Sequence, residues 1–363
     1  MTLARTALSS ALLATLCSAV ACSSSASSGN APVPQPGVNL PRPADPTEPH
    51  LANIRQITDG GENAEAYFSR DGKSITFQSS RNGRTCDQQY VMQTDGSGLQ
   101  RISNGNGKTT CGWFLPGGDR VFFGSSHMHD SLCPPKPDPS KGYVWPLDKF
   151  DIFTVKRDGT DMRRLTNYNV YTAEAVLSPN GKSIVFTSLK DGDLEIYTMN
   201  VDGTNVKRLT TTDGYDGGPW WSPDGTKIVY RAHHPKDSVE LRQYRELLAQ
   251  GMIRPSKVEL FVMNADGSDN RQITNLGGAN FGPSWTPDGK RIIFSSNHKN
   301  PRSGNFDLYL VDLDGRNLEQ VTTNGVFDGF PMFSPNGKQL IWASNRFDQK
   351  QTETNLFIAD WNP

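Results

Sequence analysis

The sequence predicts an all-β protein, a six-bladed β-propeller whose blades each contain four strands. One short pattern recurs six times: a Pro-Asp-Gly-type turn, a β-rich stretch, an Asp-Gly turn and a short strand of the form Arg/Gln-Ile/Leu-Thr. The glycines of the first turn are Gly72, Gly118, Gly181, Gly225, Gly289 and Gly337, at intervals of 46, 63, 44, 64 and 48 residues. A period in the forties with this turn chemistry is typical of one propeller blade per repeat. The composition agrees, because many short strands joined by tight turns require the 34 glycines and 24 prolines found here.

Each repeat is expected to form an inner strand, two further strands and a short outer strand. In the fourth repeat, apolar alternation and two turns place these strands at 218–222, 227–230, 260–264 and 271–274. The outer strands begin at Gln56, Arg101, Arg164, Arg208, Gln272 and Gln320. The first outer strand precedes any blade, and the last third strand, at 356–361, has no fourth strand after it. Pairing of these two strands is expected to close the ring within residues 50–363 and to remove the free sheet edges.

The segment before the repeats is predicted to be a targeting signal followed by a tether. Residues 1–21 contain Arg5 and an apolar run at 7–16, which is the arrangement of a signal peptide. Cleavage is expected before Cys22, either by an ordinary signal peptidase or at a bacterial lipobox that leaves a lipidated cysteine. We expect the lipoprotein-type processing, because a serine run follows the cysteine. Residues 22–49, rich in Ser, Pro and Gly, are predicted to be a flexible tether.

These features predict an exported protein, held in the periplasm as an outer-membrane lipoprotein. The formal net charge is −1, with both signs interspersed along the chain. We therefore expect no nucleic-acid partner, and contact with a membrane through the lipid anchor only. Whether the propeller faces the periplasm or the cell exterior is left open.

Two insertions explain the two largest intervals, and both are expected on the same face of the ring, between second and third strands. The insertion at 235–257 is predicted to contain a helix that begins at Asp237 or Ser238 and ends at Gly251. This helix either packs on the body or acts as a lid. The insertion at 127–149 is rich in proline and aromatic residues. It either packs down or presents an edge to a partner.

Three cysteines lie in the predicted propeller: Cys86, Cys111 and Cys133. In an oxidising compartment the simplest arrangement is one disulfide and one free thiol. The sequence leaves the connectivity open. We expect Cys86–Cys111, because both cysteines are predicted on loops of adjacent blades at the same rim. The spacings match no zinc-binding pattern.

A ring of basic and acidic side chains is predicted at the mouth of the central channel. The basic residues follow the second strand at an equivalent position in each repeat: Arg81, His127, Lys190, His234, His298 and Arg346. The acidic residues precede or begin the inner strands: Glu65 and Glu174 at one equivalent position, Asp216 and Asp328 at another. These side chains are predicted to form a ligand-binding rim. Imidazole with carboxylate also suits a divalent metal or acid–base chemistry, so the alternative is a metal site built from His127, His129, His233, His234 and His298.

The repeats resemble those of TolB-type β-propellers, in turns such as 222–225 and outer strands such as 271–274, and the resemblance covers about residues 51–361. An N-terminal α/β domain like that of TolB is not expected, since the tether occupies its place. The resemblance implies a binding or scaffold module of the bacterial cell envelope, with an envelope protein, peptidoglycan or a glycan as partner and no cofactor. Lyases that cleave oligogalacturonate use a related propeller and bind a metal through histidine. The alternative is therefore a metal-dependent lyase or hydrolase at the channel mouth, and enzymatic activity is left open.

Overall fold

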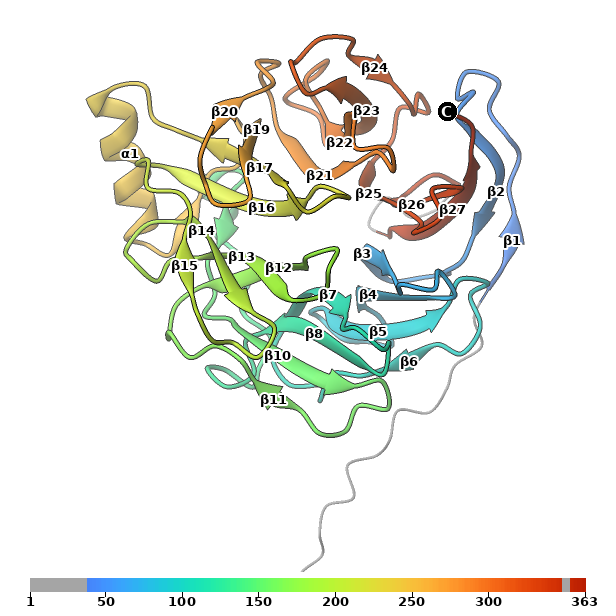
Figure 1. Cartoon of the computed structure of the whole chain (residues 1–363), viewed down its shortest axis with the longest axis horizontal. Coiled ribbons are helices and arrows are strands. Elements are labelled where there is room, and N and C mark those ends of the chain that lie inside the picture. Colours follow the sequence, from blue (N-terminus) through green and yellow to red (C-terminus); the bar gives the residue numbers. More distant parts are fainter. Residues whose placement is uncertain (1–37, 348–352) are drawn as a thin grey trace, which may run out of the picture. The chain divides into compact units, whose positions relative to one another are not determined.

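The computed structural model describes residues 38–347 and 353–363 and confirms a six-bladed β-propeller (Figure 1). The predicted signal peptide and Cys22 lie outside these residues. Blade 1 contains β3 (Glu62–Phe68), β4 (Ser74–Ser80), β5 (Gln88–Gln93) and β6 (Gln100–Arg101). Blade 2 contains β7 (Thr109–Phe114), β8 (Arg120–Ser125), β10 (Asp151–Lys156) and β11 (Arg163–Arg164). Blade 3 contains β12 (Thr172–Leu177), β13 (Ser183–Ser188), β14 (Glu195–Asn200) and β15 (Lys207–Arg208).

The second half of the ring repeats this order. Blades 4 and 5 contain β16 (Tyr215–Trp221), β17 (Lys227–His233), β19 (Glu259–Asn264) and β20 (Arg271–Gln272), then β21 (Asn280–Trp285), β22 (Arg291–Ser296), β23 (Asp307–Asp312) and β24 (Glu319–Gln320). Blade 6 contains β25 (Asp328–Phe333), β26 (Gln339–Ser344) and β27 (Asn355–Trp361), together with β2 (Leu51–Gln56) and β1 (Leu40–Pro41). All strand pairs within the blades are antiparallel.

The sixth blade takes its outermost strands from the N-terminal side of the chain. In β2, Leu51 pairs with Trp361 and Gln56 pairs with Phe357 of β27. Strand β1 then adds to the outer edge of β2, with Leu40 opposite Gln56.

The predicted tether of residues 22–49 is therefore too long at its C-terminal end. Its last part forms β1, and Glu48 is buried at 1% exposure. The side chain of Glu48 binds Arg346 of the sixth blade, with 3.0 Å between a carboxylate oxygen and a guanidinium nitrogen. A flexible segment cannot hold a carboxylate in a buried ion pair, so these residues belong to the propeller.

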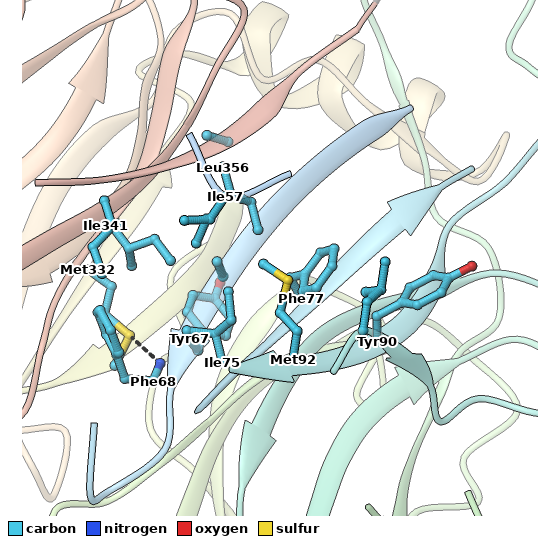
Figure 2. Packing of buried hydrophobic residues seen from close by; sticks show 14 residues of the cluster. Ile57, Tyr67, Phe68, Ile75, Phe77, Tyr90, Met92, Met332, Ile341 and Leu356 are labelled. Atoms are coloured by element: carbon cyan, nitrogen blue, oxygen red, sulfur yellow. Dashed lines mark hydrogen bonds between the residues drawn. The ribbon is translucent and has the colours of Figure 1, made fainter. Parts of the chain in front are cut away.

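The core lies between neighbouring blades, whose second and third strands are almost wholly buried. Figure 2 shows the cluster between the last and first blades, where Met332, Ile341 and Leu356 pack against Phe68 and Ile75. The backbone N–H of Phe68 also donates to the sulfur of Met332 at 3.3 Å. Each such side chain contributes about 1.5–3 kcal/mol by leaving water.

Every inner strand carries a β-bulge at the same place, and this shapes the channel. The first bulge residue of each strand lines a narrow part of the channel, and these residues are Glu65, Cys111, Glu174, Gly218, Gly282 and Phe330. All six have positive φ, between 50° and 57°. Two residues further on, Tyr67, Trp113 and Trp220 pack ring to ring at 5.1–5.3 Å. The inner strands of blades 1, 2 and 4 therefore contact one another through these rings.

The two insertions contact each other. The first contains the short helix η1 (Pro139–Lys141) and β9 (Trp145–Pro146), and the second contains α1 (Ser238–Leu248) and β18 (Met252–Ile253). Strands β9 and β18 pair antiparallel, and Leu147 N donates to the Gly251 carbonyl at 2.7 Å. The predicted helix is confirmed, but it ends at Leu248 and not at Gly251. The side chain of Asp237 caps its beginning by accepting from two backbone N–H groups. Within the described residues, no helix is long and apolar enough to cross a membrane.

The predicted disulfide between Cys86 and Cys111 is wrong. Cys86 instead bonds to Cys133 of the first insertion, with 5.6 Å between the Cα atoms. Cys111 is the bulge residue of β7, so its side chain is buried at the channel, where it donates to Glu65. The disulfide therefore fixes the beginning of the first insertion to blade 1.

Candidate functional site

The paired insertions roof a cavity of about 350 Å³ at one mouth of the channel, called here the roofed pocket. Its polar wall comes from blades 1 to 3 and the first insertion: Glu65, Gln78, Lys108, Thr110, Asp148 and Glu174. Its mainly apolar wall comes from blades 5 and 6 and the second insertion: Ile253, Phe281, Phe306, Phe327 and Phe330. Tyr215 and Arg231 of blade 4, with Phe150 and Tyr171 next to blades 2 and 3, lie between the two walls. Tyr143, Trp145, Pro146 and Leu147 of the first insertion complete the roof. Apolar walls with a few convergent polar groups are typical of a small-molecule or side-chain binding site.

A buried ion pair forms the floor of the roofed pocket. Arg231 of β17 is only 6% exposed, and its guanidinium donates to the carboxylate of Glu174. Its Nε also donates to the Tyr215 hydroxyl at 2.8 Å, while Gly218 N donates to the second oxygen of Glu174 at 2.9 Å. Burial alone would lower the pKa of Arg231, but the charge of Glu174 raises it overall. Arg231 therefore stays charged at neutral pH.

Aromatic rings surround the Arg231 guanidinium and connect it to the roof. The guanidinium carbon lies 5.3 Å from the ring centre of Trp145 and 5.8 Å from that of Phe281. Cation–π contacts of this kind are strongest where water is excluded. Arg231 thereby links the polar wall, the apolar wall and the first insertion.

Glu65 is the second carboxylate of the polar wall, and its surroundings differ from those of Glu174. It accepts hydrogen bonds from the thiol of Cys111 and from the Tyr67 hydroxyl, both neutral groups. No ion pair to Glu65 is found among the described residues. Burial raises the pKa of Glu65, the hydrogen bond from Cys111 lowers it, and the nearby charge of Glu174 raises it further, so the net shift is upward. Burial likewise raises the pKa of the Cys111 thiol, which stays protonated.

The predicted basic ring does not form a single site, because each member binds within its own part of the ring. Five members lie against the third-strand aromatic ring of their own blade: Arg81 on Tyr90, His127 on Phe153, His234 on Phe261, His298 on Tyr309 and Arg346 on Phe357. Lys190 lies over Tyr168 instead. None of the six lines the roofed pocket. The shared position of these residues reflects blade packing.

The four predicted acids divide into two pairs. Glu65 and Glu174 line the roofed pocket. Asp216 and Asp328 do not, because both are fully buried inside their blades. Asp216 binds His234 at 2.8 Å, and Asp328 binds Arg346 at 3.0 Å. These two acids hold the basic side chains that were predicted to bind a ligand.

The histidines of the alternative metal site are also engaged separately. His127 and His298 hydrogen-bond to serines of their own strands at 2.8 and 3.0 Å, and His129 binds Asp151 at 2.7 Å. The part of the chain that the structure describes contains no group of three or more His, Cys, Asp or Glu side chains placed to hold a metal ion. The predicted set, which also includes His233 and His234, is therefore not brought together.

Comparison with known proteins identifies the repeat. Residues 146–246 match the family model of the TolB β-propeller domain. This chain is a TolB-like six-bladed β-propeller. Within curated sequences it matches dipeptidyl-peptidase 5 of Porphyromonas gingivalis, with 51% identity over 39 residues. That match covers 11% of this chain and only 6% of the length of the peptidase.

Solved structures similar to this TolB-like propeller include TolB itself, a lyase and a gluconolactonase. TolB from Acinetobacter baumannii is 18% identical, with a TM-score of 0.52 over 80% of this chain and 63% of that one. An oligogalacturonate lyase from Vibrio parahaemolyticus is 12% identical (TM-score 0.53), and a gluconolactonase from Xanthomonas campestris is 14% identical (TM-score 0.56); each match covers 91% of this chain and 98% of the other. At this level of identity the similarity establishes the fold alone.

Sequence reasoning missed Arg231, although the repeats contain a signal for it. The residue after the second-strand aromatic is Gly124, Thr187, Ser295 or Ala343 in four of the blades of this TolB-like propeller. Arg231 occupies that position in blade 4, between the buried Tyr230 and Ala232. An arginine inside a buried strand requires a paired acid. The presence of Arg231 at this position of the repeat therefore indicated a buried ion pair at the channel.

Proposed function

We propose that this TolB-like propeller is an exported binding module of the bacterial cell envelope and that its ligand occupies the roofed pocket. The observation that carries the proposal is the pairing of two insertions, from blades 2 and 4, over one channel mouth. Insertions that served only to cover their own blades would not need a shared ladder. Their pairing creates a pocket with one polar and one apolar wall. An envelope protein, peptidoglycan or a glycan supplies the ligand.

The N-terminal sequence supports the location. Residues 1–21 have the features of a signal peptide, and Cys22 stands at the cleavage position of a bacterial lipoprotein. A lipid anchor at Cys22 would hold the propeller at a membrane surface. Labelling of cells with a radioactive fatty acid tests the anchor: the protein should carry the label, and Cys22→Ser should not. A wild-type protein without label would exclude lipidation.

The binding role is tested with variants of the roof. Tyr143 is 59% exposed and lines the pocket, and Trp145 stacks on Arg231. Leu132 lies on the same insertion, is 72% exposed and does not line the pocket, so Leu132→Ala is a matched control. Calorimetry with purified peptidoglycan fragments, envelope peptides and oligosaccharides should find a ligand class that the wild type and Leu132→Ala bind equally.

The double variant Tyr143→Ala/Trp145→Ala should bind that ligand at least about tenfold more weakly, because it loses about 1.4 kcal/mol or more of aromatic contact. A ligand that binds all three proteins with equal affinity would show that the roofed pocket is not the binding site. Absence of binding by the wild type to every fraction would contradict the proposed function itself. A metal-dependent lyase or hydrolase is not carried forward, because the histidines of that alternative bind separate partners.

A further inference from the structure

We infer that the ligand of the roofed pocket carries an ammonium group on an apolar body and that Glu65 is the counter-ion of this group. The inference rests on the proposed function and specifies the chemistry of its ligand. It is carried by the partners of Glu65, by the charges of the pocket wall and by the separation of the polar and apolar walls.

Glu65 is the carboxylate of the pocket that lacks a cation. Arg231 already binds Glu174 and Tyr215. The donors to Glu65 are the Cys111 thiol and the Tyr67 hydroxyl, and neither can neutralise a negative charge. A carboxylate withdrawn from water is costly unless a cation pairs with it. A ligand with an ammonium group would supply that cation.

The other charged groups of the wall leave the same deficit. The lining contains three acids and two bases: Glu65, Asp148, Glu174, Lys108 and Arg231. Once Arg231 is assigned to Glu174, two acids remain against Lys108. Lys108 acts on Asp148, whose pKa is raised by burial and lowered by this lysine. When Glu65 is ionised, the pocket is therefore short of one positive charge at this residue, and in the empty protein a proton on Glu65 can take the place of the missing cation.

The apolar wall of the pocket indicates the chemistry of the rest of the ligand. Phe281, Phe306, Phe327 and Phe330 line the cavity, and the ionisable side chains of the lining from blades 4 to 6 are Tyr215 and Arg231. Aromatic faces attract ammonium groups and bury apolar side chains. A peptide N-terminus with an apolar first residue, or the amine of a lysine side chain, has this combination of groups. An uncharged sugar would leave the carboxylate without its cation.

The titration of Glu65 gives the inference a second readout. The groups that face Glu65 are Cys111 from β7, Glu174 from β12, Arg231 from β17 and Tyr67 from its own strand. Since burial raises the pKa of Glu65, the empty protein holds a proton there up to a higher pH than an exposed glutamate would. Binding of an ammonium group favours the carboxylate and expels this proton. Affinity should therefore rise with pH through that range and fall only when the amine itself loses its proton.

The test uses the full chain and isothermal titration with four probes: phenylalanyl-alanine, its N-acetyl derivative, N-acetyl-lysine amide and a neutral disaccharide. The wild type should bind at least one free amine about tenfold or more tightly than the N-acetylated dipeptide. Comparison of the dipeptide with the lysine derivative distinguishes an N-terminus from a side-chain amine. Titration in buffers of different ionisation enthalpy should show proton release on binding.

Glu65→Gln should abolish the preference for the free amine and the proton release, while Glu62→Gln, on the exposed end of the same strand, should preserve both. If Glu65→Gln fails to fold, proton release by the wild type still tests whether amine binding ionises Glu65. Equal binding of the free and acetylated dipeptides, preference for the disaccharide, or no amine binding at all would overturn the inference. The double variant Tyr143→Ala/Trp145→Ala tests the proposed function independently, because it should weaken the binding of any ligand in the pocket.

Discussion

Arg231 determines the charge of the pocket floor, because one buried guanidinium satisfies one of two neighbouring carboxylates. The other carboxylate, Glu65, is left with neutral donors. This difference separates two glutamates that occupy equivalent bulge positions in their blades. Equivalent residues of a repeat can thus acquire different chemistry from a single substitution on a neighbouring strand.

Replacing Arg231 by methionine should destabilise the protein by about 3–5 kcal/mol, because Glu174 would lose the cation of its buried ion pair. The double variant Arg231→Met/Glu174→Gln should recover a large part of this loss, since no unpaired charge then remains. Urea denaturation monitored by circular dichroism measures both free energies of unfolding. Equal losses in the single and double variants would show that packing, and not charge, explains the effect.

At the scale of elements, strand positions follow from sequence but strand irregularities do not. The second strands, such as β22 (Arg291–Ser296), are predicted from their apolar residues and from the turns on either side. The bulges were not predicted, because Glu65, Cys111 and Phe330 have positive φ without being glycine. Tertiary packing around the channel imposes that conformation. The Cys86–Cys111 prediction failed for this reason, since it placed a channel residue on a loop.

The roof was predictable only in part. The helix of the second insertion has a local signal in Asp237 and the spacing of its apolar residues. Strands β9 and β18 contain two residues each and lie in insertions far apart in sequence. Such short strands have no periodicity to detect, so the pocket that they cover was not visible in the sequence. Glu65 and Glu174 were singled out from their equivalent positions four residues before the turn serine, whereas Trp145 and Arg231 were not singled out.

The Cys86–Cys133 disulfide should stabilise the propeller by holding the first insertion to blade 1. Its two cysteines are 47 residues apart, and removal of a crosslink of this length costs about 2–4 kcal/mol. Cys86→Ser/Cys133→Ser should show that loss in urea denaturation. Mass spectrometry of a non-reduced digest of the wild type should show the 86–133 link.

In the folded wild type, Cys111 should resist alkylation because its thiol is buried and its pKa is raised by burial. It should react once the protein is unfolded. A digest that contains a peptide linked through Cys111 would contradict this arrangement.

At the scale of the whole molecule, the N-terminal side of the chain contributes to the sheet formed by its C-terminal side. Strand β2 pairs with β27, and Glu48 reaches Arg346 and the backbone N–H of Thr323. Arg346 also binds Asp328, so one cation joins the inner strand of blade 6 to a residue near the N-terminal end of the described chain. In a ring of blades, each interface supports two neighbours, and a weak interface should therefore lower the stability of the entire propeller.

Glu48→Ala should lower the free energy of unfolding by about 3 kcal/mol, because it removes one partner of a buried ion pair and the acceptor of Thr323 N. Asp45→Ala is the control: this acid is only partly buried and its carboxylate accepts hydrogen bonds from Thr47 alone among the described residues, so its loss should change stability by less than about 0.5 kcal/mol. Trp342, which donates to Asp328 at 2.9 Å and lies 5.1 Å from the Arg346 guanidinium, reports on blade 6 by fluorescence. If the ring is one cooperative unit, fluorescence and circular dichroism of Glu48→Ala should show a single, coincident transition at lower denaturant. An earlier fluorescence transition would mean that blade 6 opens separately and that the ring is held together by local interfaces alone.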